Sequence, residues 1–228
     1  MRLRILLLVA GAGASVALRG LDDQVPRALV LESGRPVLEF AMLMANASIP
    51  SGIEIRHADA THFRRLRFDQ VSGSTVPVST LVDQFNTTHA DYRASMKDGV
   101  LVIRPVERTT RFLDERSTLQ PVQVTGVMNA LTRVFGQLVP SLAVPSASLG
   151  SFLGGVPPDL GENVTIDLNG AGRPVLDVLI DIVKQAPRTW YVETEPVDEG
   201  ANPRISRIGF LLANGKGVFQ PIEAHSAR

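Results

Sequence analysis

The chain has 228 residues, of which 44% are hydrophobic and 20% are charged, so it is long enough and apolar enough to bury a core. Its 23 basic residues balance its 23 acidic residues, which removes the electrostatic reason to expect nucleic acid as a partner. It contains no cysteine, and this excludes disulfides, thiolate metal sites and a cysteine nucleophile.

The N-terminus has the pattern of an export signal. Two arginines precede an apolar run over residues 5–18, which is too short to span a bilayer comfortably. Ser15 and Ala17 supply the small residues that signal peptidase prefers. We therefore expect residues 1–20 to be a signal peptide, with an uncleaved anchor or a buried first helix as the alternative. We expect the mature chain to be periplasmic or secreted, with no membrane span, since no later apolar run is long enough.

After the signal, residues 21–112 are expected to form the N-terminal α+β unit or units. Residues 28–31 have the composition of a short strand. Pro36–Ala47 is expected to be an amphipathic helix, because proline suits the first turn and apolar residues recur at helical spacing. Ile53 and Ile55 then alternate with polar residues, as in a strand.

The next stretch repeats this outline. Alternating apolar residues predict a strand within residues 66–71, and the apolar spacing over residues 78–85 predicts a helix. Two extended runs follow, at residues 92–96 and 100–103. Because Asp98-Gly99 separates them, we expect a tight β-hairpin here.

Residues 113–228 are expected to form the C-terminal α+β unit. Helical spacing of apolar residues predicts one helix over Pro121–Leu138. Residues 139–163 are rich in proline and glycine, and so long a loop is unusual in a compact domain. It is a linker, a mobile binding loop or an insertion. The apolar residues in it that are candidates for contact with a partner are Leu149, Phe152, Leu153 and Val156.

The final segment has the clearest pattern. Residues 164–169 alternate as a strand, and Pro174–Gln185 is expected to be a helix. Thr189–Glu193 and Ile205–Leu212 are expected to pair as strands, with a loose tail from Gly215.

A short phrase occurs twice in the chain. Gly34-Arg35-Pro36-Val37-Leu38-Glu39 recurs as Gly172-Arg173-Pro174-Val175-Leu176-Asp177, and each copy opens an apolar-periodic helix. The recurrence suggests a duplicated strand–helix unit. The expected fold is therefore α+β, with repeated β-α-β(β) units whose helices pack on small mixed sheets, divided near residue 112.

The order of strand, Pro-started helix and two strands resembles the secretin and TonB short N-terminal domain. The residues that carry the resemblance are Val164–Leu168, Arg173–Leu179 and Trp190–Val192, with an earlier match at Val76–Leu81 and Asp98–Ile103. The resemblance implies a small exported α+β module that contacts other proteins in the periplasm. It implies no catalytic residues.

Few residues suggest chemistry. His57, Asp59 and His62 are of types that bind zinc, although their spacing matches no established signature. Gly170-Ala171-Gly172 is expected to be a tight turn rather than a dinucleotide-binding loop, since Val175 stands where the third glycine is needed. No catalytic, cofactor-binding or metal-binding residue is therefore assigned, and no cofactor is expected.

We further expect Trp190 to face the core, and Glu193 and Glu195 to face solvent. Together these patterns predict an exported, non-enzymatic protein-binding module of the cell envelope, with a protein partner of unknown identity or a second copy of the chain. Two alternatives stay open. One is a small metal-dependent enzyme that uses His57, Asp59 and His62, and the other is a structural envelope protein.

Overall fold

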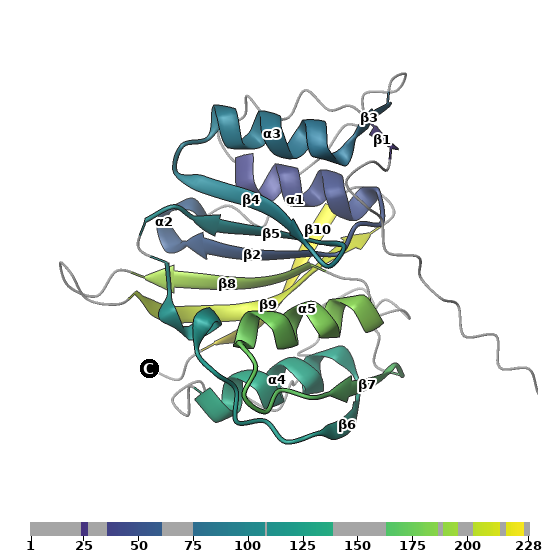
Figure 1. The fold of residues 1–228 in the computed structure, drawn as a ribbon, viewed down its shortest axis with the longest axis vertical. Helices are drawn as coiled ribbons and strands as arrows, with labels where there is room; N and C mark the ends of the chain where they lie inside the picture. The colour runs from purple at the N-terminus through teal and green to yellow at the C-terminus, as the bar shows by residue number, and fades with distance from the viewer. Residues whose placement is uncertain are drawn as a thin grey trace, which may run out of the picture.

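The computed structural model describes residues 24–26, 36–60, 75–107, 109–138, 163–186, 189–195, 203–214 and 218–225. The helices are α1 (Pro36–Asn46), α2 (His57–Ala60), α3 (Val78–Thr88), α4 (Val127–Leu138) and α5 (Val175–Gln185), with a 3-10 helix at Arg111–Asp114. The strands are β1 (Gln24–Pro26), β2 (Ser51–Arg56), β3 (Thr75–Pro77), β4 (Tyr92–Lys97), β5 (Val100–Pro105), β6 (Val122–Thr125), β7 (Thr165–Leu168), β8 (Thr189–Glu195), β9 (Arg204–Asn214) and β10 (Val218–His225). The fold is α+β, as the sequence predicts (Figure 1).

A six-stranded mixed sheet runs through the middle of the molecule, in the order β10-β9-β8-β2-β5-β4. β2 pairs in parallel with β5 on one side and with β8 on the other, and the remaining pairs in this sheet are antiparallel. Two short ribbons, β1-β3 and β6-β7, complete the described strands. Parallel pairs are usually buried on both faces, and helices cover both faces here.

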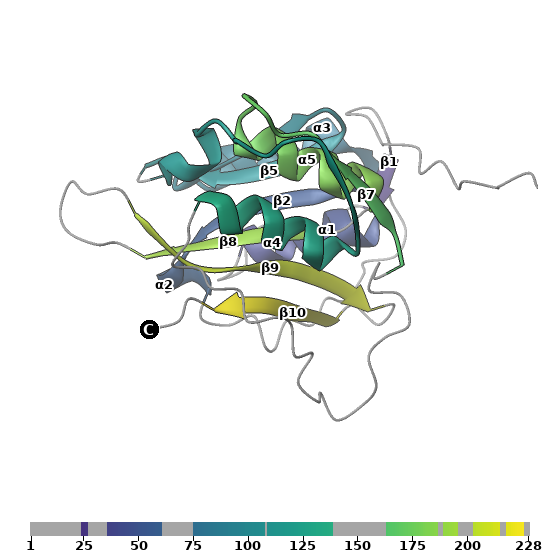
Figure 2. The same cartoon turned by 90° about the horizontal axis from the view of Figure 1, so that it is seen from below.

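The two faces of the sheet carry separate cores. One core lies under α1 and α3, where the rings of Phe40 and Phe85 stack at 4.7 Å between centroids. The other lies under α4 and α5, where Phe112 and Phe135 stack at 5.0 Å. Figure 1 shows α1 and α4 on opposite sides of β8, and in Figure 2, seen from below, α4 lies in front of the sheet and α1 behind it. The period-2 alternation of side chains in the strands divides the apolar residues between the two cores.

β8 lies inside the sheet, between β2 and β9, and is buried on both faces because one of the two cores packs on each face. Trp190 and Val192 belong to the core under α4 and α5, whereas Tyr191 belongs to the core under α1 and α3. The prediction that Trp190 faces the core is confirmed, since its exposed fraction is 1%.

Two β-α-β-β units recur in the structure, although the strand expected to open the first of them, at residues 66–71, lies outside the described residues and β3 opens it instead. They are β3-α3-β4-β5 and β7-α5-β8-β9, and both helices have 11 residues. Pro77 (φ −58°, ψ 146°) and Pro174 (φ −54°, ψ 141°) precede the helices with nearly the same backbone angles. At the other ends, the N–H groups of His89 and Ala186 each donate to the carbonyl four residues earlier. The units therefore share their caps as well as their order of elements.

β2 joins the last two strands of each unit into one sheet, because it lies between β5 of the first unit and β8 of the second. Strands from both sides of the predicted division at residue 112 are thus hydrogen-bonded neighbours. The division itself stays a prediction.

The β4-β5 hairpin is confirmed. Lys97 pairs with Val100, and the two residues between them have positive φ angles of 51° at Asp98 and 78° at Gly99. A two-residue turn of type I′ needs this conformation at both positions, and Asp-Gly supplies it at low steric cost.

Two predictions on the second half of the chain are wrong in part. The expected helix over Pro121–Leu138 is divided into β6 and α4 by Gly126, whose φ is 93°. The tail expected to be loose beyond Gly215 contains β10, which pairs with β9 along its whole length. In both cases pairing with another strand decides the structure. β6 pairs with β7, which is distant in sequence, and β10 pairs with β9.

Several predictions lie outside the described residues. These are the signal peptide at residues 1–20, the strands at residues 28–31 and 66–71, and the partner-contact residues Leu149, Phe152, Leu153 and Val156. Among the helices that are described, none has the length and apolar character needed to cross a bilayer.

Candidate functional site

Polar side chains gather where the parallel strands β2 and β8 end. His57 follows β2 directly and begins α2, while Glu193 and Glu195 lie near the carboxyl end of β8. In open sheets with parallel strands, ligands bind most often at the carboxyl ends of the strands. We call these three residues the His57 cluster.

The side chains of the His57 cluster converge. His57 Nδ1 makes a close contact with Glu193 Oε1 and lies 3.8 Å from Glu195 Oε1. One candidate ligand atom from each residue lies within 4.8 Å of the other two. The Glu193 side chain is only 1% exposed, whereas those of Glu195 and His57 are 31% and 48% exposed. The cluster is therefore buried at Glu193 and open to solvent at His57.

The prediction that Glu193 faces solvent is wrong. The register of β2 and β8 places Glu193 beside Ile55, on the face of the sheet that α1 covers. Glu195 lies at the end of the strand and is half-buried. The alternation of side chains along β8 correctly predicts that the two carboxylates lie on the same face of the sheet. It does not predict that β8 is an interior strand.

A second network holds α2 beside the cluster. Arg56 Nε and the Tyr92 hydroxyl both donate to Asp59 Oδ2, at 2.9 and 2.6 Å. The Arg56 guanidinium also lies over the Tyr92 ring, 5.0 Å from its centroid. Burial alone would lower the pKa of Arg56, but the hydrogen bond to Asp59 and the neighbouring Tyr92 raise it. Burial and the hydrogen bond to Asp59 raise the pKa of Tyr92 well above its usual range.

The predicted metal set is thus divided. His57 belongs to a group that can bind a metal ion, but Asp59 is held by Arg56 and Tyr92 instead of pointing to His57. His62 lies outside the described residues. The two carboxylates that do approach His57 are more than 130 residues away in sequence, since Glu193 follows it by 136 positions. Only the pairing of β2 with β8 brings them together, so no local spacing could have indicated them.

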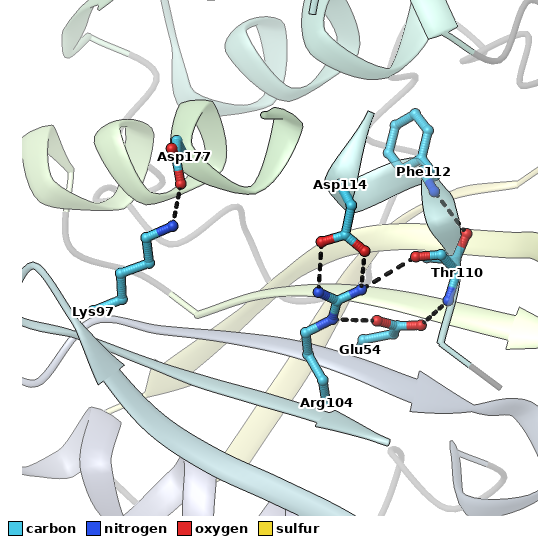
Figure 3. Close-up of polar contacts among 7 residues, drawn as sticks. All are labelled: Glu54, Lys97, Arg104, Thr110, Phe112, Asp114 and Asp177. Carbon is cyan, nitrogen blue, oxygen red and sulfur yellow. Dashed lines mark hydrogen bonds and ion pairs between the residues drawn. The ribbon is translucent and has the colours of Figure 1, made fainter. Parts of the chain in front are cut away.

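A buried ion pair lies on the other face of the sheet (Figure 3). Glu54 of β2 accepts from Arg104 Nε at 2.8 Å and from the Thr110 backbone N–H. The Arg104 guanidinium also donates two bonds to Asp114, at 2.9 and 3.0 Å. Burial raises the pKa of Glu54 above its usual value, although the Thr110 and Arg104 bonds oppose the shift. This network fastens the 3-10 helix to the sheet, and we interpret it as structural.

In the Gly170-Ala171-Gly172 turn, the N–H groups of both glycines are engaged. Gly170 N–H donates to Leu119 O and Gly172 N–H donates to Ser117 O, at 3.2 and 2.8 Å. Arg173 N–H in turn donates to Gly170 O. Because these donors close onto backbone carbonyls, they cannot also hold a phosphate group.

Comparison with known proteins gives no relative: no protein-family model, no curated protein and no solved structure matches this chain.

Proposed function

We propose that the chain is an exported, non-enzymatic protein-binding module of the cell envelope, similar in role to the secretin and TonB short N-terminal domains. The observation that carries the proposal is the pair of β-α-β-β units, each with a Pro-led helix of 11 residues and with its last two strands in the same sheet. The export pattern of the N-terminus supports the compartment.

The two edge strands of the sheet, β4 and β10, are poorly suited to pair with a strand of a partner protein. At the β4 edge, the Asn86 side chain accepts from the Ala94 N–H at 2.8 Å and donates to the Ala94 carbonyl at 2.9 Å. At the other edge, β10 contains Pro221, which has no N–H to offer. Both features oppose the addition of a partner strand. We therefore assign the partner contact to the apolar segment 149–156 rather than to an edge strand.

Site-specific photocrosslinking in the native host tests this function. A photoreactive amino acid at Phe152 is expected to give one discrete protein adduct in the envelope fraction, and replacing Leu149 and Leu153 with serine should abolish it. The same amino acid at Arg93, which is exposed on β4, is the control and should give no such adduct. Cytosolic protein, or equal labelling from both positions, would contradict the proposal.

The two alternatives, a metal-dependent enzyme and a structural envelope protein, can be distinguished from a protein-binding module. A metal-dependent enzyme would have to use His57 without Asp59, because Arg56 and Tyr92 hold the Asp59 carboxylate. A structural envelope protein would assemble with itself, so light scattering over a concentration series would show a growing mass with no second protein present.

A further inference from the structure

We propose that His57, Glu193 and Glu195 bind one divalent transition-metal ion, with zinc as the best match. The site goes beyond the protein-binding function, and it would act as a clamp between the two halves of the sheet. It combines one imidazole nitrogen and two carboxylates, and zinc accepts both ligand types.

The distances suit this ion. Zinc lies about 2.0–2.2 Å from nitrogen and oxygen ligands, so two of its ligand atoms are separated by about 3.4 Å at the tetrahedral angle and by up to about 4 Å as that angle opens. The separation of 3.8 Å between His57 Nδ1 and Glu195 Oε1 fits that span. His57 Nδ1 and Glu193 Oε1 make a closer contact than two ligand atoms of one zinc ion do, so an ion bound to both would require the half-exposed His57 side chain to move away from Glu193.

The charges of the site also favour a cation. Glu193 is almost completely buried and Glu195 lies beside it, so two carboxylates share a partly desolvated position. Burying a carboxylate is costly unless an opposite charge compensates it. A divalent ion bound to both carboxylates would place positive charge beside them.

The ligand set discriminates among ions. Calcium and magnesium prefer shells made of oxygen, with six or more ligands, so an imidazole disfavours them. Imidazole with carboxylates suits zinc and the neighbouring transition metals. The three protein ligands leave a coordination position, and the half-exposed ring of His57 places that position at the surface. The ion can therefore exchange with solvent.

Neighbouring residues hold the site in place. The Arg56, Asp59 and Tyr92 network fixes the start of α2 against β2 and β4, and so orients the residue that supplies the imidazole. Supporting contacts of this kind usually matter to metal affinity. Because His57 follows β2 and both carboxylates come from β8, the ion would connect the strand that lies between the two β-α-β-β units to a strand of the second unit.

Metal binding to the full chain, purified without a histidine tag and dialysed against chelator, tests the proposal. Titration calorimetry with zinc chloride is expected to give one site per chain, and the melting temperature should rise with zinc concentration. Cobalt as the probe should give visible absorption bands of a four- or five-coordinate ion. Magnesium at the same concentrations should leave the melting temperature unchanged.

The variants separate this site from adventitious binding. H57A and E195Q, which alter the two partly exposed ligands, should weaken zinc binding about 10-fold or more and should remove the cobalt bands. H89A removes another histidine and should bind zinc as the unaltered chain does. Folding of each variant is checked by circular dichroism without metal. Binding that H57A and E195Q leave unchanged, or the absence of one-to-one binding in the unaltered chain, would overturn the proposal.

Discussion

The indole ring of Trp190 lies directly over Gly52. The two residues are partners in the register of β2 and β8. A Cβ atom on residue 52 would lie only 2.0 Å from Cζ2 of the ring and 2.1 Å from Cε2. Glycine is therefore required at the centre of the sheet, where the parallel strands that join the two units meet.

The substitution G52A should be strongly destabilising. The methyl group would displace the Trp190 ring from the core under α4 and α5, and overpacking of this kind costs about 1–3 kcal/mol or more in the free energy of unfolding. Urea unfolding followed by Trp190 fluorescence measures both the loss and the movement of the ring.

G136A is the matched control for this substitution. Gly136 lies in α4, and a Cβ there would meet no atom within 4 Å. Alanine in a helix is favoured over glycine, so this variant should gain about 0.5–1 kcal/mol. Equal effects of G52A and G136A would show that the close approach of Trp190 does not determine stability.

Glu54 should make stability depend on pH in a defined direction. Because burial raises its pKa in the folded state, the folded protein holds this proton more tightly than the unfolded chain does. Its stabilising contribution is complete below about pH 4.5 and is lost as the pH rises through the raised pKa. E54Q lacks this titration, so its free energy of unfolding relative to the unaltered protein should increase as the pH rises from about 4.5.

Urea unfolding at a series of pH values measures this difference. E107Q, which removes the charge of an exposed carboxylate, is the control. A difference between E54Q and the unaltered chain that stays flat or falls with rising pH would refute the prediction.

Local patterns were sufficient for much of this fold. Asp98-Gly99 indicates the hairpin, because these residue types tolerate the positive φ angles of a tight turn. A proline followed by apolar residues at helical spacing indicates α3 and α5. The pattern at Val122 and Val124 is ambiguous, since Val124 continues the helical spacing of α4 and also alternates with Val122 as in a strand. Pairing with β7, about 40 residues later, decides in favour of β6.

The candidate site was less accessible from the sequence. The imidazole and carboxylate groups of His57, Asp59 and His62 suggest a metal site, but these residues are neighbours in sequence. The actual neighbours depend on strand order, because β8 lies beside β2 and not at an edge. A single sequence shows how side chains alternate within a strand, but it does not show where that strand lies in the sheet.

Asn86 should protect the β4 edge from association. Its amide satisfies both backbone groups of Ala94, so N86A would leave a donor and an acceptor open on an edge strand. We expect a loss of about 1–3 kcal/mol and a mass that grows with concentration in light scattering. In the control T87A, only a bond from an exposed hydroxyl to the carbonyl of Asp83 in the same helix is lost. Identical masses for the two variants would contradict this role of Asn86.

The ion pair between Lys97 and Asp177 should couple the two β-α-β-β units weakly. Lys97 ends β4, and its ammonium group donates to Asp177 in the first turn of α5 (Figure 3). Both side chains are partly exposed, so a double-mutant cycle with K97A and D177A should give a coupling free energy of about 0.2–1 kcal/mol.

D177A alone should cost more than K97A, because Asp177 also interacts favourably with the N-terminal end of the α5 dipole. Urea unfolding of the four proteins at low salt and at about 1 M salt measures both effects, since the Debye length is then only about 3 Å. A coupling that persists unchanged at high salt would mean that the contact is desolvated. The two units would then be held together at this point by more than a surface ion pair.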